Sequence, residues 1–161
     1  MSSLKKSIVK IPDSSEENFV DKYFPNWSIP YLHLSRADRP TGTWLLLLPC
    51  WFGILLAYIE KNNLSITFYE IWLLVACTIG AFLMRGAGCT WNDILDKDYD
   101  AKVKRTQNRP IPSGQVTIRG AIYWMILQSL LAFIILLTFN KFSVLVACLS
   151  LLLVAIYPLA K

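Results

Sequence analysis

The segment Arg85–Gly114 reads RGAGCTWNDILDKDYDAKVKRTQNRPIPSG and continues a long apolar run. Four aspartates lie among the nine residues from Asn92 to Asp100. If the apolar run is a helix that continues through them, successive residues turn by about 100°. Asn92, Asp96 and Asp100 then lie on one face, within roughly 80° of one another. The segment therefore gathers oxygen-bearing side chains into a stripe at the end of a predicted helix.

This stripe predicts a metal site. Carboxylates at the C-terminal end of a helix repel one another and are repelled by the negative end of the helix dipole. A divalent cation removes both penalties, and ligands that are all oxygen suit Mg²⁺ or Ca²⁺ and would not select a soft metal. Asp93 lies at the edge of the stripe, and Asp98 points to the opposite side.

The residues that follow the aspartates are basic, and prolines and a glycine then turn the chain. The cations are Lys102, Lys104, Arg105 and Arg109. A metal bridges phosphate oxygens, and arginine binds the remaining ones in a planar fork. The arrangement therefore suits an anion carried on a metal, above all a diphosphate. The alternative is a solvated, charge-balanced loop, but the spacing on one face and the cations that follow favour the binding site.

The composition indicates an integral membrane protein. Of the 161 residues, 55% are hydrophobic and 17% are charged, which is too apolar for an ordinary soluble domain. We predict an all-α fold of about four transmembrane helices, because each apolar run is long enough to cross a bilayer. The predicted spans are residues 42–59, 71–91, 121–139 and 142–159, and residues 92–120 form an aspartate-rich loop.

Arg85 lies inside the second predicted span. A charge that faced lipid there would cost at least ~2.5 kcal/mol, so we expect Arg85 to face the interior of the bundle or a wet cavity. Gly86 and Gly88 beside it allow the backbone to approach another helix or a ligand closely.

The distribution of lysine and arginine predicts the orientation. Six of them precede the first span, six lie in residues 92–120, and the two opposite turns carry one each, Lys61 and Lys141. Positive loops face the cytoplasm, so the tail and the aspartate loop are expected on the cytoplasmic or matrix side.

Residues 1–28 are expected to form a polar tail on that side, frayed over residues 1–23. Residues 1–23 have mixed charge and no apolar core, which excludes a cleaved secretory signal. Their acidic residues also argue against a mitochondrial transit peptide. We therefore favour a bacterial inner membrane, with the mitochondrial inner membrane as the alternative.

Other classes of site find no support. The four cysteines have no paired spacing, so neither a disulfide framework nor a zinc site is predicted. The chain lacks the arginine-rich blocks typical of nucleic-acid binding. We predict no nucleic-acid partner.

The aspartate-rich segment resembles the first motif of the UbiA family of membrane prenyltransferases, through Asn92-Asp93-x-x-Asp96-x-x-x-Asp100, then Lys104-Arg105-Thr106-x-x-Arg109-Pro110 and Gly114. Two flanking segments resemble the 4-hydroxybenzoate polyprenyltransferase branch of that family, namely Arg85-Gly86-Ala87-Gly88-Cys89-Thr90 and Arg36-x-x-Arg39-Pro40-x-Gly42. The resemblance makes residues 29–161 the N-terminal part of a UbiA-type helical bundle.

The resemblance implies Mg²⁺-dependent transfer of a polyprenyl group from polyprenyl diphosphate to the ring of 4-hydroxybenzoate, for ubiquinone biosynthesis, in a bundle surrounded by lipid. The implied metal ligands are Asn92, Asp96 and Asp100, of which the two aspartates are also catalytic. The implied diphosphate ligands are Lys104, Arg105 and Arg109. Arg39 would lie near the aromatic acceptor, as a catalytic and substrate-binding residue. The alternative for Arg36 and Arg39 is that they anchor the first helix at the membrane surface.

Members of the family continue beyond the position of Lys161 with further helices and a second aspartate motif. We therefore expect a truncated gene product or a fragment with little or no turnover alone, and a separately expressed C-terminal half as a partner. Three alternatives stay open. They are a UbiA-type enzyme with another acceptor, a CDP-alcohol phosphotransferase, and a non-catalytic four-helix membrane protein or assembly partner.

Overall fold

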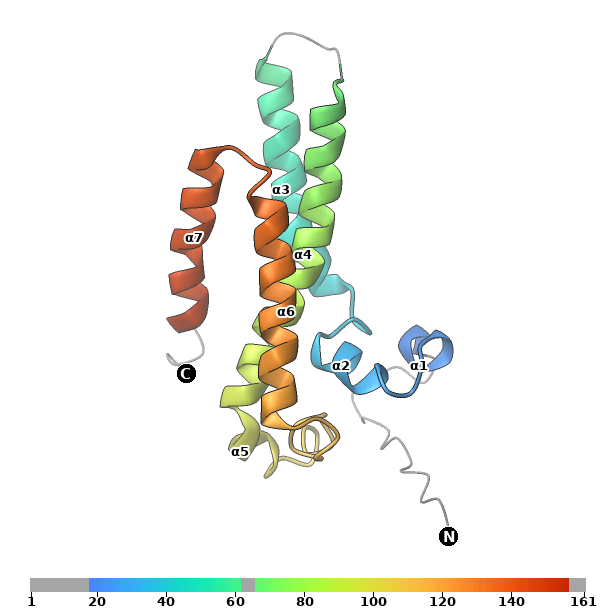
Figure 1. Cartoon of the computed structure of the whole chain (residues 1–161). Helices are drawn as coiled ribbons and strands as arrows, with labels where there is room; N and C mark the ends of the chain where they lie inside the picture. Colours follow the sequence, from blue (N-terminus) through green and yellow to red (C-terminus); the bar gives the residue numbers. More distant parts are fainter. Residues whose placement is uncertain (1–17, 62–65, 157–161) are drawn as a thin grey trace.

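The computed structural model describes residues 18–61 and 66–156, and these ranges contain helices and no strand (Figure 1). The helices are α1 (Phe19–Tyr23), α2 (Ile29–Leu34), α3 (Thr41–Glu60), α4 (Phe68–Leu95), α5 (Lys97–Asp100), α6 (Ile118–Leu136) and α7 (Lys141–Ile156). The predicted all-α membrane fold is confirmed.

Three of these helices, α3, α4 and α6, are long and apolar enough to cross a membrane. Over the fourth predicted span, α7 is a shorter apolar helix of 16 residues, which ends at the last described residue. Many large apolar side chains along the helices are exposed, among them Phe68 at 83% and Leu56 at 67%. Such exposure suits a bundle whose outer surface meets lipid, because lipid carries no penalty for apolar side chains.

The site depends most on α4, because this helix carries the aspartates. It begins with a capping box in which the Glu70 side chain accepts from the Thr67 backbone N–H at 2.9 Å. It then runs without a break through Arg85, past the predicted end of the span at Trp91, and stops at Leu95. Asp96 leaves the helical conformation, with φ −84° and ψ 2°, and the single turn α5 follows.

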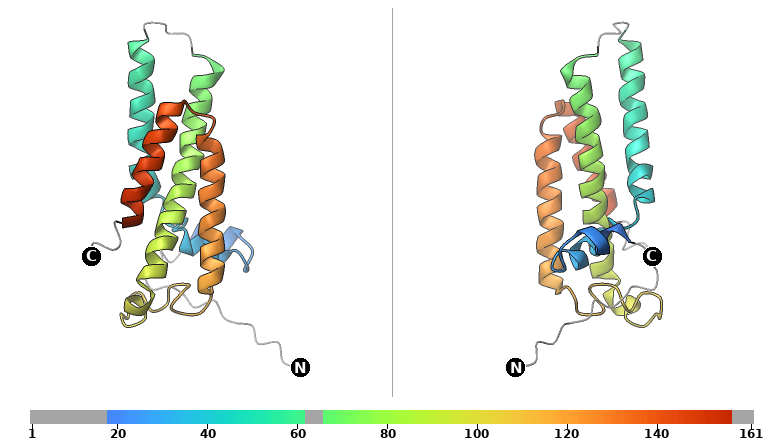
Figure 2. Two further views of the ribbon diagram at one scale, coloured as in Figure 1. Left: turned by 60° about the vertical axis from the view of Figure 1, so that its left-hand side comes forward. Right: turned by 90° about the vertical axis from the view of Figure 1, so that its right-hand side faces the viewer.

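Helix α4 lies between α3 and α6 and packs against both (Figure 2). After α6 the chain turns, and α7 runs back along the bundle (Figure 1). At the end of the bundle that carries α5, the short helix α2 contacts both α4 and α6. The buried cluster of Leu34, Ile111, Val116 and Ala121 lies there too. Buried side chains therefore concentrate where the aspartates are.

Part of the predicted tail is ordered. The side chain of Asn18 caps α1 by accepting from the Val20 N–H at 3.0 Å, and Val20 is fully buried. The expectation of a frayed tail is therefore wrong from Asn18 onward. Residues 1–17, the turn residues Asn62 and Asn63, and the segment from Tyr157 to Lys161 lie outside the described residues.

Candidate functional site

The site begins with a sharp turn between α2 and α3. Arg36 has φ 56°, a left-handed conformation that costs a non-glycine residue roughly 1–2 kcal/mol. The Arg36 N–H donates to the His33 carbonyl and the Ala37 N–H to the Leu32 carbonyl, both at 3.0 Å. This is the Schellman pattern, in which glycine is the usual residue at the Arg36 position. The turn therefore places an arginine side chain where the backbone alone would favour glycine.

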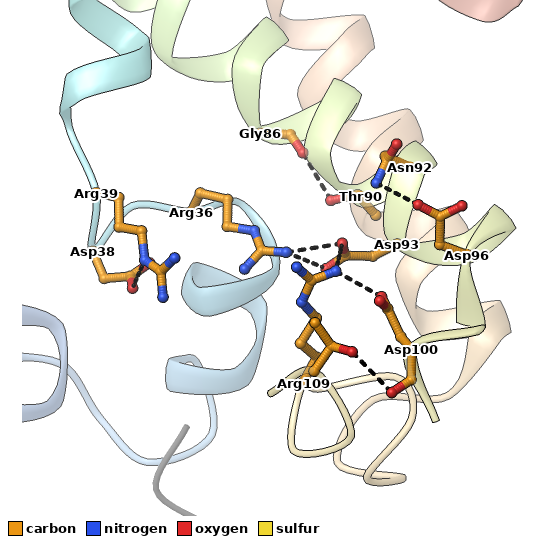
Figure 3. Close-up of polar contacts among 11 residues, drawn as sticks. Arg36, Asp38, Arg39, Gly86, Thr90, Asn92, Asp93, Asp96, Asp100 and Arg109 are labelled. Carbon is orange, nitrogen blue, oxygen red and sulfur yellow. Dashed lines mark hydrogen bonds and ion pairs between the residues drawn. The ribbon is translucent and has the colours of Figure 1, made fainter. Parts of the chain in front are cut away.

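The guanidinium of Arg36 reaches Asp93 on α4 (Figure 3). Its Nη2 donates to both carboxylate oxygens, at 2.9 Å to Oδ1 and 3.1 Å to Oδ2. Asp93 is 1% exposed. A buried carboxylate needs such partners, because an unpaired charge away from water is very costly.

Arg109, in the loop between α5 and α6, joins the same cluster. Its Nη1 lies 3.3 Å from Asp93 Oδ1 and 2.6 Å from Asp100 Oδ2. The loop is held in place by Thr106, whose buried hydroxyl donates to the Asp100 carbonyl at 3.0 Å. Two arginines from distant parts of the sequence therefore meet at one buried aspartate. We call Arg36, Asp93, Asp100 and Arg109 the ion cluster.

The other half of the aspartate motif, Asn92 and Asp96, forms a separate contact beside the ion cluster (Figure 3). Asn92 Nδ2 donates to Asp96 Oδ2 at 3.0 Å, and both side chains are half-buried (Figure 3). Asn92 and Asp96, which are four residues apart, thus lie together as helical pitch predicts, whereas Asp100 faces Arg109 (Figure 3). The described residues contain no group of three or more Asp, Glu, His or Cys side chains that could hold a metal. Metal binding by Asn92, Asp96 and Asp100 stays a prediction.

The remaining predicted site residues lie outside the ion cluster. Arg39 lies beside Asp38, with 3.3 Å between Nε and Oδ2, and away from Asp93 (Figure 3). Lys104 and Arg105 are exposed on the loop, and Asp98 is exposed on α5. The prediction that Asp98 points away from the stripe agrees with that exposure.

Arg85 turns toward the start of α3, inside the bundle as expected. Its Nη2 donates to the Arg39 carbonyl at 3.4 Å, and its Nε is buried without a hydrogen-bond partner. A Cβ on Gly42 would lie within the Arg85 guanidinium. A side chain at position 42 would therefore require the end of the Arg85 side chain to move.

A buried polar network fixes the turn before Arg36. Trp124 Nε1 donates to Ser35 Oγ at 2.7 Å, and Ser35 Oγ donates to Gln128 Oε1 at 3.1 Å. Gly86 on α4 gives these groups room, because a Cβ there would lie 2.0 Å from Gln128 Oε1 and 3.0 Å from Ser35 Cβ. Helices α4 and α6 therefore both fix the position of Ser35, the residue that precedes Arg36.

His33 ties α1 to the same turn. Its Nε2 lies 2.9 Å from Asp21 Oδ1, and its Nδ1 lies 3.8 Å from Asp38 Oδ2, an ion-pair distance rather than a hydrogen bond. Burial lowers the pKa of His33, but the carboxylates of Asp38 and Asp21 outweigh it and raise the pKa above 6.5. Burial likewise raises the pKa of Asp38, and contact with His33 and Arg39 brings it below 3.8.

The sequence model of the UbiA prenyltransferase family matches residues 46–161 of this chain, well over half of it. The chain belongs to the UbiA prenyltransferase family. The CDP-alcohol phosphotransferase alternative is therefore wrong.

Curated relatives within the UbiA family are named 4-hydroxybenzoate polyprenyltransferase, mitochondrial. The Arabidopsis thaliana protein is 45% identical over 146 residues, 91% of this chain and 35% of the relative. The human protein is 47% identical over 132 residues, 82% of this chain and 34% of the relative. The Caenorhabditis elegans protein is 44% identical over 161 residues, 99% of this chain and 42% of the relative.

The chain thus spans about a third to two fifths of the length of these UbiA relatives. No solved structure matches it.

The sequence alone did not predict that Arg36 pairs with Asp93 of the aspartate motif. It placed Asp93 at the edge of the metal stripe and left Arg36 as a possible surface anchor. The two residues are 57 positions apart, and no local spacing relates them. The sequence did contain a signal for this pair. Arg36 and Asp93 lie in two charged motifs at the ends of apolar helices, and such charged residues need partners once they are buried.

Proposed function

We propose that this chain provides the first aspartate motif for transfer of a polyprenyl group from polyprenyl diphosphate to the ring of 4-hydroxybenzoate, in ubiquinone biosynthesis. The observation that supports the proposal most is identity of 44–47% to relatives of that name over most of the chain. The geometry agrees with it, because aspartates and arginines converge at one end of an apolar bundle.

The residues fit the divalent metal that UbiA prenyltransferases generally use. Asn92 and Asp96 place two oxygen-bearing side chains beside each other on α4. Mg²⁺ is usually bound through one or two carboxylates together with substrate phosphates and water. Asn92 and Asp96 can therefore hold the metal from this side, while Asp100, the third predicted ligand, pairs with Arg109. When bound, Mg²⁺ would neutralise charge on the diphosphate as it leaves.

The arginines of the ion cluster would stabilise the remaining negative charge on the diphosphate. Arg109 and Arg36 are fixed donors at the mouth of the bundle, and fixed donors stabilise developing negative charge most where water is excluded. The C–O bond to the diphosphate breaks to give an allylic cation. A ring carbon of 4-hydroxybenzoate attacks this cation and then loses its proton, which leaves the prenylated ring and free diphosphate.

The experiment uses a chimera, because the chain covers about a third of its Arabidopsis relative. Residues 1–161 replace the matching segment of that protein, and prenylated 4-hydroxybenzoate is measured in membranes at several Mg²⁺ concentrations. Asp96→Ala should lower activity by about 10²-fold or more, the usual size of a lost electrostatic contribution. Asp98→Ala is the matched control and should stay within about twofold, because surface changes are mild.

Equal loss from both substitutions would contradict the assignment of Asp96. A chimera that forms no prenylated 4-hydroxybenzoate, but prenylates another aromatic acceptor, would replace the proposed acceptor. A chimera inactive with every acceptor tested would count against the proposed function itself.

We further propose that the chain lies in the mitochondrial inner membrane with α5 on the matrix side. The relatives are named mitochondrial, which favours this membrane over the bacterial one, and the basic residues lie at the α5 end. Cysteine replacing Lys104 should react with an impermeant maleimide only from the matrix side, and cysteine replacing Lys61 only from the other side. The unsubstituted chain reports background labelling, and reversed labelling would disprove the orientation.

A further inference from the structure

We propose that Asp93 is a positioning residue and not a metal ligand, and that it holds the guanidinium groups of Arg36 and Arg109 so that both bind oxygens of the diphosphate. This inference rests on the proposed function, since it assigns a role to a residue of the same site. It separates the aspartates of the motif into two groups with different tasks.

The contacts of Asp93 are those of a counter-ion. Both of its carboxylate oxygens receive guanidinium donors, from Arg36 at 2.9 and 3.1 Å and from Arg109 at 3.3 Å. The side chain is 2% exposed, so a hydrated cation could not reach it without breaking these pairs. Asp96 is different, since it is half-buried and lies against Asn92.

The two arginines retain donors for an anion. Arg36 contacts Asp93 through Nη2, and Arg109 contacts both of its aspartates through Nη1. A guanidinium has five N–H donors in a fixed plane, so each arginine has further donors once it is oriented. Two guanidinium planes fixed from one side match the many oxygens of a diphosphate, which arginine binds in a forked geometry.

The ion cluster has charges of both signs around it. Arg36 and Arg109 are balanced by Asp93 and Asp100. Arg85 adds a further cation at this end of α4, and within residues 18–61 and 66–156 no carboxylate forms an ion pair with it. Arg85 therefore adds positive charge near the two arginines, and the half-buried Asp96 adds negative charge at the same end of the bundle.

The backbone conformation of Arg36 independently supports a role for its side chain in the site. Its left-handed conformation favours glycine, yet arginine occupies it, and the adjacent Ser35 is fixed by Trp124 and Gln128. A turn that served only to connect α2 with α3 would be better made with glycine. The strain is therefore maintained for the side chain, as is common where a residue has a role in a site.

The same backbone supplies the decisive variant. Arg36→Gly removes the guanidinium while it relieves the turn, so loss of binding cannot be ascribed to a broken turn. Purified chain in detergent micelles is titrated with inorganic diphosphate in the presence of EDTA, and the thermal midpoint is followed, since a bound ligand raises it. Asp93→Asn, Asp96→Asn and Asp98→Asn are measured in parallel, the last as the matched control.

We expect diphosphate to raise the midpoint of the unsubstituted chain and of Asp96→Asn and Asp98→Asn, because these side chains do not hold the arginines. The rise should be lost in Arg36→Gly and in Asp93→Asn. A rise that persists in Arg36→Gly, or no rise in the unsubstituted chain, would overturn the proposal. If Asp93→Asn does not fold, Arg36→Gly alone decides.

In the chimera, Asp93→Asn and Arg36→Gly should raise the KM for polyprenyl diphosphate about tenfold, the size of one lost charged contact. The Mg²⁺ concentration for half-maximal rate should not change, whereas Asp96→Asn should raise it. An increased Mg²⁺ requirement in Asp93→Asn with unchanged KM would make Asp93 a metal ligand. The titration in EDTA measures binding of diphosphate and requires no turnover. Its result therefore tests the role of Asp93 independently of whether the chimera transfers a prenyl group.

Discussion

The two ends of α4 meet very different surroundings. Around Phe68 the large side chains of α3 and α4 point outward, and Phe68 is 83% and Ile59 64% exposed. Around Thr90 and Asp93 the side chains are almost fully buried, and both residues carry polar groups that pair with specific partners. The exposed apolar side chains at the first end need no individual partners, whereas the buried polar groups at the second end each pair with a specific one.

This difference has an energetic cause. An apolar side chain in lipid can be replaced by another apolar one, because no individual interaction is lost. A buried ion pair behaves otherwise, since removal of one partner leaves an uncompensated charge and costs about 3–5 kcal/mol. The comparison therefore predicts that sensitivity to substitution rises along α4 from Phe68 toward Asp93.

Asp93→Ala should cause the largest loss of stability. It leaves Arg36 and Arg109 without their shared buried partner, so we expect a loss of about 3–5 kcal/mol. Unfolding of the chain by SDS in mixed micelles, followed by tryptophan fluorescence, measures this. Asp98→Ala, on the exposed face of α5, should stay within about 0.5 kcal/mol. Similar small losses in both variants would show that the ion cluster does not hold this end together.

Gly86→Ala should come second. The new methyl group would meet Gln128 Oε1 and Ser35 Cβ, and overpacking of this kind costs about 1–3 kcal/mol. Gly88→Ala is the matched control two residues along, where a Cβ meets nothing within 4 Å. It should be neutral or stabilising by up to about 1 kcal/mol, because alanine is the better helix former. Equal thermal midpoints for the two variants would contradict close packing of α4 against Ser35 and Gln128.

His33→Gln should have the smallest effect, and one that depends on pH. The folded-state pKa of His33 is raised above 6.5. Its contribution to stability is therefore complete below pH 6.5 and is lost as the pH rises through the folded-state pKa. The stability difference between the unsubstituted chain and His33→Gln should shrink between pH 6 and a pH above that pKa. A difference that grows over this range would reverse the assigned sign.

Asp38 sets the opposite limit of that window. Its folded-state pKa lies below 3.8, so its contribution is present above pH 3.8 and is lost as the pH falls through the folded-state value. Cleavage by protease after α1 at a series of pH values would report the docking of α1 on α2 directly. The slowest cleavage is expected between these two limits.

Much of the fold could be read from local patterns. Apolar runs predicted the helices, and the segment from Asn92 to Asp100 predicted that α4 would continue beyond Trp91, because both follow from residue character and helical pitch. The pairing of Asn92 with Asp96 follows from the same spacing. The ordered helix α1 was missed, because its short polar sequence is stabilised by burial of Val20 and not by a periodic pattern.

The order of the residues is enough to predict an apolar helical bundle with aspartates and arginines at one end. The pairing of Asp93 with Arg36 and Arg109 is visible only once the helices and the loop are packed together. The physical reason is distance along the chain. Helical pitch relates residues four apart, but a contact between residues 57 apart depends on a left-handed turn and a loop whose paths are fixed by packing.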